Sequence, residues 1–472
     1  MVKRIAIIGG GISGLAAALE CSKRTDKCDF QLFESSNRLG GVIETLQEGD
    51  YLIEKGADNF ATLLPSALDL SQEFAAADDL THPEADNRRA FVLKNGVPEP
   101  IPLGFSLMQP TQFASILATR TLSPLGKLRL LSEYFIEGKQ WQDEEDESLE
   151  SFAVRRLGRE AFEALVEPIV SGIFTADPSK LSMRATMPQF VKMEQDHGGL
   201  IRAFLHSKKT DAAAIARKAS GARYDQFVAP KQGMTAWIEQ LSQRIPVENL
   251  ALGVQVTQVQ QRAGGWQVGI DRNGIQDLQD FDAVVLATPA AITSSLLQSS
   301  KPDVAALVGK IHYASSAVAA LVVKKSELFG RTDGFGLICP RREGRRALAI
   351  SYSSNKYAGR VPNDEILLRI FFGGALDASI LDQSDEDLLR LAKLEISELL
   401  NWRGTECSRE WLIRWPNAMP QYDLGHQQRV GNINKLVAAT PSLALCGAAY
   451  SGVGIPQCVR SGRAAVKQLL DT

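Results

Sequence analysis

The sequence contains no run of apolar residues long enough to form a membrane-spanning helix. Crossing a bilayer takes about 18 consecutive apolar residues, whereas this chain of 472 residues is 44% hydrophobic and 23% charged, with the two classes interspersed. Any association with a membrane is therefore expected to be peripheral. Lys3 and Arg4 before an apolar run imitate a secretory signal, but the glycines that follow fit a nucleotide-binding turn better, so we expect this segment to be retained.

Cysteine is scarce, and neither sign of charge is in large excess. The six cysteines form no C-x-x-C pair and no metal-ligand spacing, which predicts core thiols in a reducing compartment, no metal site and a cytoplasmic location. They are Cys21, Cys28, Cys339, Cys407, Cys446 and Cys458. With 52 basic and 55 acidic residues the net charge is −3, a balance that argues against a nucleic-acid partner.

A glycine-rich turn stands near the start of the chain. The apolar run from Ile5 to Ile8 leads into Gly9, Gly11 and Gly14, and then into a helix-like run. This order of strand, tight turn and helix N-terminus lets backbone N–H groups approach a pyrophosphate. By itself the pattern is equally compatible with an ordinary strand-to-helix turn.

Glu34 supplies the second signal for a nucleotide. It lies twenty residues beyond Gly14, at the end of a strand predicted for Phe30 to Phe33. In a βαβ unit an acidic residue at this position accepts hydrogen bonds from the ribose hydroxyls of an adenine dinucleotide. Together the two signals predict a dinucleotide-binding domain.

The segment after Glu34 narrows the choice of dinucleotide. It places Arg38, Gly40 and Gly41 in the pattern E-x-x-x-R-x-G-G, where a cation and exposed N–H groups can reach a second phosphate, although a solvated turn is the alternative. The pattern resembles the FAD-binding signature of the amine oxidase and protoporphyrinogen oxidase superfamily. The resemblance implies FAD as the cofactor, held at this end by Gly9, Gly11, Ile12, Ser13, Gly14, Glu34, Ser35, Arg38, Gly40, Gly41 and Val42.

The resemblance also implies cofactor contacts further along the chain. It sets the turn after Tyr51 against the flavin and a strand valine beside the adenine, where a strand-end loop and a buried valine are the simpler alternatives. The last glycine loop, before Pro456, would aim a helix N-terminus at the N1/C2 carbonyl edge of the flavin and stabilise its reduced form. The implied contacts are Gly56, Ala57, Asn59, Val256, Gly447, Val453, Gly454 and Ile455.

The stretch from Ser148 to Gly199 is the most distinctive in the sequence. We expect an amphipathic helix from Glu160 to Glu167, ended by Pro168 and a turn at Gly172. The motifs R-R-x-G, S-G-I-F, D-P and L-S in this stretch closely resemble the oxygen-dependent protoporphyrinogen oxidase family, and the resemblance, to a bacterial member, extends over essentially the whole chain.

The resemblance implies an activity as well as a cofactor. Protoporphyrinogen IX would be oxidised to protoporphyrin IX in haem biosynthesis, losing six electrons in three rounds of hydride transfer to flavin N5, with molecular oxygen as acceptor and hydrogen peroxide as by-product. This scheme needs no catalytic side chain, and none is assigned. Some bacterial relatives oxidise coproporphyrinogen III instead, so that substrate is the alternative. More distant alternatives are a flavin amine oxidase and a flavin-stabilised scaffold without activity.

Substrate contacts are inferred by resemblance at five positions. Plant and animal relatives place a propionate-binding arginine six residues before the glycine of a hairpin, here predicted at Lys94 to Gly96, and that count falls on Ala90. We therefore hypothesise that the neighbouring Arg89 binds a propionate. The full set is Arg89, Gly172, Gly336, Ile338 and Tyr357, each of which could instead be plain core or loop.

Trp415 to His426 contains the family's P-Q-Y-x-x-G-H motif, and its prolines and glycine predict a loop. His426 invites assignment as a base, but no carboxylate or nucleophile partner is in view, so we interpret it as structural.

The expected fold class is α/β, with an FAD-binding Rossmann-like domain of the GR2 type, a mixed α/β substrate domain and an inserted helical domain. The first comprises residues 1–87, 230–290 and 435–472, the second 88–102 and 291–434, and the third 103–229. Apolar residues near cations in the insert predict peripheral membrane docking, with ordinary helix packing as the alternative. They are Phe105, Leu107, Met108, Phe113 and Leu117, near Arg120, Lys127 and Arg129. A homodimer and handover of product to the next haem-pathway enzyme are further possible partnerships.

Overall fold

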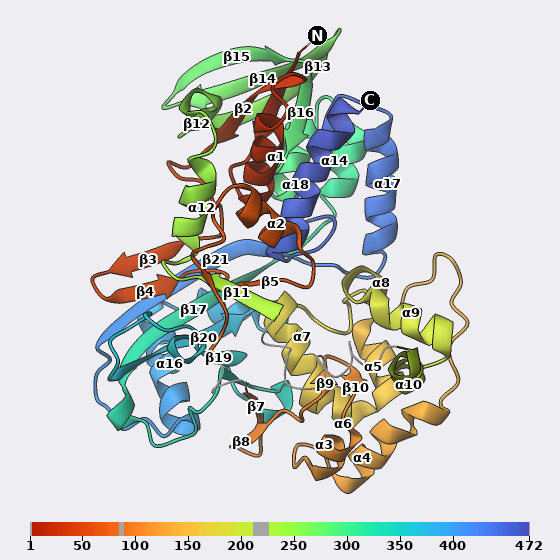
Figure 1. Cartoon of the computed structure of the whole chain (residues 1–472), viewed down its shortest axis with the longest axis vertical. Coiled ribbons are helices and arrows are strands. Elements are labelled where there is room, and N and C mark those ends of the chain that lie inside the picture. The colour runs from red at the N-terminus through yellow and green to blue at the C-terminus, as the bar shows by residue number, and fades with distance from the viewer. Residues whose placement is uncertain (1, 85–88, 211–225, 472) are drawn as a thin grey trace.

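The computed structural model describes residues 2–84, 89–210 and 226–471. A parallel sheet with its helices occupies one half of the molecule, and a second sheet beside a group of helices occupies the other (Figure 1). The two ends of the chain lie together in the first half, where the Lys3 ammonium donates to the carbonyl of Leu469 at 2.6 Å. The predicted α/β class is confirmed.

The first sheet has five parallel strands, taken from three distant segments of the chain. In spatial order they are β12 (Leu250–Leu252), β2 (Cys28–Glu34), β1 (Lys3–Ile8), β16 (Ala283–Leu286) and β22 (Leu443–Leu445). Parallel strands covered on both faces need apolar side chains throughout, which explains why β1 and β16 read as nearly continuous apolar runs. The strand that carries Val256 is not part of this sheet: it is β13 (Gln255–Arg262), which begins shortly after β12 ends.

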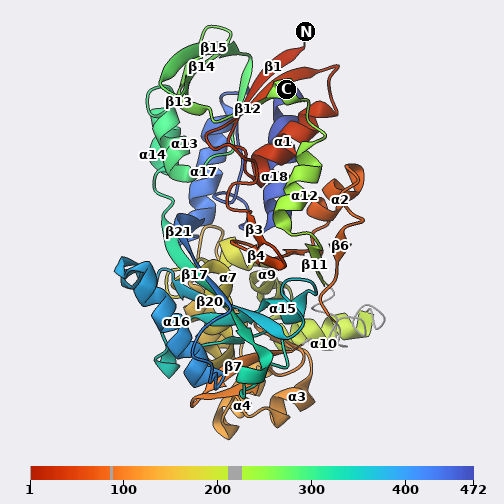
Figure 2. The same ribbon diagram turned by 90° about the vertical axis from the view of Figure 1, so that its left-hand side faces the viewer.

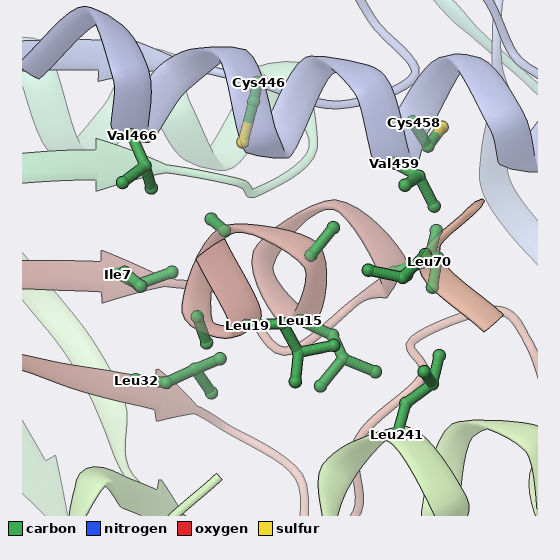
Figure 3. Close-up of a cluster of buried hydrophobic side chains, with 14 of the residues drawn as sticks. Ile7, Leu15, Leu19, Leu32, Leu70, Leu241, Cys446, Cys458, Val459 and Val466 are labelled. Carbon is green, nitrogen blue, oxygen red and sulfur yellow. The ribbon is translucent and has the colours of Figure 1, made fainter. Parts of the chain in front are cut away.

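One face of this sheet is covered by the first and last helices, α1 (Ile12–Ser22) and α18 (Ile455–Leu470), together with α12 (Met234–Ser242) (Figure 2). Side chains from the strands and helices meet in one apolar core, in which Leu15 and Leu19 lie between Leu32 and the α18 residue Val459 (Figure 3). A Cβ at Gly462 of α18 would come within 2.0 Å of the Ser13 carbonyl oxygen. The middle of α18 therefore packs closely against the first turn of α1.

The other face carries a small antiparallel sheet and three helices. The sheet is formed by β13 (Gln255–Arg262), β14 (Gly265–Arg272) and β15 (Ile275–Phe281), and the helices are α13 (Ala290–Leu297), α14 (Pro302–Val308) and α17 (His426–Ala438). Trp266 and Val284 are among the residues of this second core.

The second half of the molecule is built on a mixed sheet of seven strands. In order these are β21 (Arg409–Pro420), β17 (Tyr313–Lys324), β20 (Glu365–Gly373), β19 (Ala349–Tyr352), β18 (Gly336–Ile338), β7 (Ala90–Lys94) and β8 (Val97–Pro100), with α16 (Asp385–Leu399) packed on one face. The predicted hairpin at Lys94 to Gly96 is confirmed, since it joins β7 to β8. The loop predicted from Trp415 is wrong up to Pro420, because β21 is an edge strand and edge strands tolerate proline.

Short helices form the remaining part, on the opposite side of this sheet. They are α3 (Phe113–Ala118), α4 (Pro124–Leu131), α5 (Leu149–Leu157), α6 (Arg159–Ala161), a π-helix (Phe162–Val166), α7 (Glu167–Phe174), α8 (Met183–Thr186), α9 (Pro188–His197) and α10 (Leu200–Thr210). The predicted helix end at Pro168 is wrong, because Pro168 lies in the first turn of α7, where its missing N–H costs nothing. The chain continues helically past Gly172.

The minor elements complete the chain. The short strands are β3 (Thr45–Glu48), β4 (Tyr51–Glu54), β5 (Phe60–Ala61), β6 (Leu80–Thr81), β9 (Phe105–Ser106), β10 (Gln109–Pro110) and β11 (Phe227–Pro230), and the remaining α-helices are α2 (Ser66–Glu73) and α15 (Ser353–Lys356). Turns of 3₁₀-helix occur at Ser132–Phe135, Val247–Asn249, Lys325–Glu327, Arg341–Glu343 and Ala378–Asp382. The division into three domains remains a proposal, which the membership of the two large sheets supports; residues 85–88 and 211–225 of those ranges lie outside the described residues.

The helical part presents only some of the apolar surface predicted from its sequence, such as Leu117. Phe105 and Met108 are buried in its core, so the expectation that they face a membrane is wrong. The guanidinium of Arg129 is engaged within the protein, because it donates to the carbonyls of residues 154–156 at the end of α5. Among the described residues of this part, the exposed aliphatic and phenylalanine side chains are Leu103, Leu117, Leu125, Leu128, Phe135 and Ile173. Peripheral docking stays a prediction, and no helix in the described ranges could cross a bilayer.

Candidate flavin and substrate site

The first glycine turn is shaped by close packing between β1 and α1. A Cβ at Gly14 would lie 1.8 Å from the Gly9 carbonyl oxygen, so no larger residue fits there. At Gly11 the reverse holds, because a Cβ would meet nothing within 4 Å. Gly11 is the N-cap of α1, and no side chain caps this helix. The N–H groups of the first turn are therefore available to an anion, as the sequence predicted for the segment that includes Ile12 and Ser13.

Glu34 is held rigidly at the end of β2. Its carboxylate accepts hydrogen bonds from the backbone N–H of Gly10 at 2.7 Å and of Ser36 at 2.8 Å, and the Ser35 hydroxyl lies 3.3 Å from one of its oxygens. These bonds fix the carboxylate beside the glycine turn. The oxygen that accepts from Gly10 keeps a lone pair that a ribose hydroxyl can use.

The second glycine turn touches the first. The Gly40 N–H donates to the Gly10 carbonyl at 2.9 Å, and a Cβ at Gly41 would lie 3.2 Å from the Gly11 Cα. Arg38 organises this turn, since its guanidinium donates to the carbonyls of Leu39, Gly41 and Ile43 at 3.2, 2.6 and 3.0 Å. It also pairs with Glu44 at 3.0 Å. The phosphate contact predicted for Arg38 would require these bonds to rearrange.

A third turn, at Gly56 to Asn59, connects the second glycine turn to the large mixed sheet. A Cβ at Gly56 would lie 2.4 Å from the carbonyl oxygen of Val42, whose own side chain is exposed. On the other side, Trp415 of β21 donates its indole N–H to the Lys55 carbonyl at 2.9 Å. Gly56 and Val42 are thus neighbours, as expected if both contact one cofactor, and Ala57 is exposed at the tip of the turn.

A cluster of charges fixes this third turn from the substrate side. Arg369 of β20 donates to the Gly56 carbonyl and lies 3.5 Å from the Asp58 carboxylate, while Lys356 lies 3.3 Å from the same carboxylate. Burial tends to raise the pKa of Asp58, but the two cations outweigh it and lower the pKa below its usual value. Asn59 donates to the other Asp58 oxygen at 2.9 Å. No local motif predicts that Arg369 contacts Asp58, because the two residues lie 311 positions apart.

The loop between β22 and α18 forms the other end of the predicted cofactor site. Gly447 donates its N–H to the Ser461 hydroxyl at 3.1 Å, and a Cβ on it would meet nothing within 4 Å. Gly454 is the N-cap of α18, Ile455 is the first helical residue, and Pro456 follows in the first turn with no capping side chain. Val453 packs against the apolar core of the helical part. An open backbone thus leads into a free helix N-terminus, which favours negative charge.

Tyr422 is a residue of this site that the sequence did not reveal. Its hydroxyl donates to the Ala448 carbonyl at 2.6 Å and accepts from the Gly452 N–H at 2.7 Å, so it joins both ends of the loop. His426 stacks on its ring, with ring centroids 4.0 Å apart. Burial, with a smaller effect of Arg429, lowers the pKa of His426 to about 4. Its ring has the backbone of Tyr450 as a polar neighbour and no side-chain hydrogen-bond partner among the described residues, which supports the structural interpretation.

The five substrate candidates do not all come together. Gly336 and Ile338 lie on one face of β18, where they pair with Ala90 and Val92 of the parallel β7. Helix α7 packs against β18, and a Cβ at its Gly172 would meet nothing within 4 Å. These three positions therefore lie on neighbouring elements, and we call them the predicted substrate wall.

Arg89 and Tyr357 lie outside this wall. The register pairs Ala90 with Gly336, and side chains alternate between the faces of a strand, so Arg89 does not share the face of Gly336. Its half-exposed guanidinium pairs with Asp333 at 3.2 Å. Tyr357 is 2% exposed, and its hydroxyl has the Asn59 side chain as a polar neighbour. Burial, and then Asp58, raise its pKa well above the usual value, which places Tyr357 by the third turn.

Val256, the candidate for the adenine side, lies on β13 and is buried in the second core. Two residues before it, Val254 donates its N–H to the Glu34 carbonyl at 2.9 Å. Val256 is therefore close to the ribose end of the predicted site.

Comparison with known proteins identifies the family to which this architecture belongs. The family model for flavin containing amine oxidoreductases matches residues 12–470. The chain belongs to this family. It is 32% identical, over 99% of its length and 98% of the relative's, to coproporphyrinogen III oxidase of Bacillus subtilis. Human protoporphyrinogen oxidase is 30% identical, with 100% of this chain and 99% of that protein covered.

The solved structures that the chain resembles agree with this assignment. A crystal structure from Exiguobacterium sp. 255-15, provisionally named a protoporphyrinogen oxidase, superposes with a TM-score of 0.84 at 26% identity and covers 99% of both chains. Reduced UDP-galactopyranose mutase gives a TM-score of 0.72 at 14% identity, covering 100% of this chain and 94% of that one, which shows a shared fold only. The protoporphyrinogen/coproporphyrinogen oxidase family inferred from the sequence is confirmed, and membership implies a flavin cofactor.

The geometry fits such a cofactor. Two touching glycine turns, an oriented carboxylate and two uncapped helix N-termini lie at the carboxyl ends of β1, β2 and β22, where open α/β sheets bind nucleotides. Gly11 and Gly447 leave space on their open sides. The residue-by-residue contacts remain predictions, and the described residues contain no cluster of side chains suited to a metal ion.

Proposed function

We propose that this protein is an FAD-dependent coproporphyrinogen III oxidase that forms coproporphyrin III in haem biosynthesis, with molecular oxygen as electron acceptor. The sequence motifs alone favoured protoporphyrinogen IX, with coproporphyrinogen III as the alternative. The observation that carries the revised choice is the end-to-end similarity to three bacterial enzymes of that name, at 32%, 28% and 28% identity. Protoporphyrinogen oxidases are also similar, at 24% to 30% identity.

The residues of the chain would bind and orient the two reactants. Glu34 would hold the ribose of FAD, the N-termini of α1 and α18 would face its phosphates and its flavin edge, and the bound flavin would supply two-electron oxidation and reaction with oxygen. The Gly56 turn, clamped by Arg369, would fix the flavin against the mixed sheet. The wall of Gly172, Gly336 and Ile338 would then present the largely apolar macrocycle to it.

No side chain of the site is required as a general acid or base. His426 is buried, and its pKa of about 4 keeps it neutral at neutral pH. Lys356 is bound to Asp58. Positioning and exclusion of water are therefore the contributions that we assign to the protein.

Steady-state oxidation of the two purified porphyrinogens tests the proposal. Porphyrin fluorescence gives kcat/KM for each substrate in air, and hydrogen peroxide is measured in parallel. We expect a clear preference for coproporphyrinogen III, with three molecules of peroxide for each porphyrin. A higher kcat/KM for protoporphyrinogen IX would restore the other substrate, and amine oxidation without porphyrin formation would overturn the proposal.

A further inference from the structure

Positive charge is concentrated in the loop between β18 and β19, although the chain as a whole carries a small net negative charge. Four arginines lie within six residues, Arg341, Arg342, Arg345 and Arg346, although the net charge of the protein is −3. The turn of 3₁₀-helix from Arg341 to Glu343 ends at Gly344, whose φ of +68° reverses the chain. The loop therefore displays its arginines from a compact turn.

A cavity of about 280 Å³ lies between this loop and α7. Pro168 and Ser171 line it on the helix side, and Cys339, Arg341 and Arg346 on the loop side. Ser171 directly precedes Gly172, and Cys339 directly follows Ile338. The cavity thus adjoins two of the positions predicted to line the substrate wall, at the end of the sheet where β18 stops.

Most of the charges around the cavity are compensated. Arg346 makes two hydrogen bonds to the Asp377 carboxylate, at 3.0 and 3.2 Å, and Arg345 pairs with Glu398. Arg341, in contrast, has no carboxylate within 4.0 Å in the described ranges and is exposed to solvent. One cation at the mouth of the cavity is therefore available to a ligand.

Ser171 provides an unpaired donor on the opposite side of the same cavity. Its side chain is 7% exposed, and its hydroxyl has no hydrogen-bond partner among the described residues. A buried hydroxyl without a partner costs about 1–3 kcal/mol, so a ligand atom that accepts a hydrogen bond here would recover that cost. A cation and a free donor at one cavity form a site for a carboxylate.

Glu167 is the group that opposes an anionic ligand. It also lines the cavity, and burial raises the pKa of its carboxyl while Arg341 works in the other direction. A second carboxylate nearby raises the pKa of the Glu167 carboxyl further. Glu167 would then take up a proton and donate a hydrogen bond to the carboxylate of the ligand. Arg345 and Arg346 are neutralised by Glu398 and Asp377, so once Glu167 is protonated Arg341 is the uncompensated charge of the lining, and it favours an anion.

We propose that Arg341 and Ser171 bind a propionate carboxylate of the porphyrinogen and so select a tetrapyrrole that carries propionates on all four rings. This inference rests on the proposed function. Coproporphyrinogen III has one propionate on each ring, whereas protoporphyrinogen IX has propionates on two neighbouring rings only. A carboxylate site at the far end of the substrate wall can therefore be filled by the first substrate in an orientation where the second presents an apolar vinyl group.

The test compares Arg341→Gln with Arg342→Gln, a matched control in the same loop that does not line the cavity. A lost hydrogen bond to a charged group corresponds to about a tenfold change in affinity. We expect Arg341→Gln to raise KM for coproporphyrinogen III about tenfold, with kcat and the KM for protoporphyrinogen IX little changed. Coproporphyrin III binding, followed by quenching of flavin fluorescence, should weaken by the same factor, and Ser171→Ala should act in the same direction.

The possible outcomes separate the two proposals. An unchanged KM for coproporphyrinogen III in Arg341→Gln, or an equal rise for both substrates, would overturn the carboxylate site while leaving the proposed function intact. An Arg342→Gln enzyme with the same defect as Arg341→Gln would also overturn it. A wild-type enzyme that oxidises neither porphyrinogen would remove the proposed function itself. Because Arg341 is exposed, circular dichroism and the melting temperature of the variant should match the wild type.

Discussion

The hydroxyl of Tyr422 accepts a hydrogen bond from the backbone N–H of Gly452 at 2.7 Å. The same hydroxyl donates to the carbonyl of Ala448 at 2.6 Å, so one side chain fixes the conformation of the loop that leads to α18. That loop carries Gly447, Val453 and Gly454, which are predicted to contact the flavin. Tyr422 therefore acts on the cofactor site through the loop rather than by contact.

Replacing Tyr422 by phenylalanine should weaken FAD binding without unfolding the protein. The substitution keeps the ring that stacks on His426 but leaves two polar backbone groups without partners, at about 1–3 kcal/mol each. We expect the dissociation constant of FAD, measured by titrating the apoprotein, to rise at least about tenfold. Tyr134→Phe, at a half-exposed ring in the helical part, is the control. A Tyr422→Phe protein that binds FAD as tightly as wild type would contradict this role.

His426 makes stability depend on pH. Its folded pKa of about 4 lies below the usual histidine value of 6.5, because burial disfavours the imidazolium. The unfolded chain binds more protons between these values, so this stabilisation is complete above about pH 6.5 and is lost as the pH falls towards 4. The free energy of unfolding should fall by up to about 3 kcal/mol over that range.

Urea unfolding at several pH values measures this slope. We expect His426→Phe to flatten it, because the substituted ring can stack but cannot titrate, and His312→Gln, at an exposed histidine, to leave it unchanged. Equal slopes in wild type and His426→Phe would show that the imidazole is not the group responsible.

Glu34 should control nucleotide affinity. Its carboxylate is oriented by the Gly10 and Ser36 N–H groups, and Glu34→Ala removes the acceptor for the ribose hydroxyls. Hydrogen bonds to charged groups contribute about 1.5–3 kcal/mol, so the dissociation constant of FAD should rise at least about tenfold. Glu239→Ala, at an exposed position of α12, serves as the control. Retention of wild-type affinity in Glu34→Ala would exclude the predicted ribose contact.

A buried charge network holds the helical part together. Arg156 is fully buried and pairs with Glu133 and Glu194, which are also buried. Arg156→Met would leave these carboxylates without this partner, and breaking a buried pair costs about 3–5 kcal/mol. Arg159→Met breaks largely exposed pairs with Glu150 and Glu163 and should cost less than about 1 kcal/mol. Similar unfolding free energies for the two variants would refute this account of the network.

Local motifs in the sequence predicted the parts of the site that are local in the structure. Gly9, Gly14 and Glu34 were recognisable because strand, turn and helix follow one another directly. The residues that hold the predicted flavin-binding turns in place could not be recognised from local motifs. Tyr422 reaches Gly452, and Arg369 reaches Gly56, across long stretches of chain. For Tyr422 the P-Q-Y motif was the available signal, but it did not reveal the contact.

The errors have equally specific causes. A proline predicts a helix end at Pro168, but the preceding π-helix lets a new helix begin there with proline in its first turn. The assignment of Arg89 stays a prediction: counting along the chain leads to Ala90, and a count cannot tell which face of the sheet the neighbouring Arg89 occupies. The pairing of Ala90 with Gly336 shows that Arg89 does not share the face of Gly336. Arg341 is therefore considered as the alternative cation for a propionate.

Anaerobic mixing of the purified yellow protein with coproporphyrinogen III tests the central claim most directly. The account predicts rapid bleaching of the flavin absorbance, its return when air is admitted, and the appearance of coproporphyrin III fluorescence. A flavin that stays oxidised in the presence of coproporphyrinogen III, while an amine or protoporphyrinogen IX bleaches it, would contradict the account.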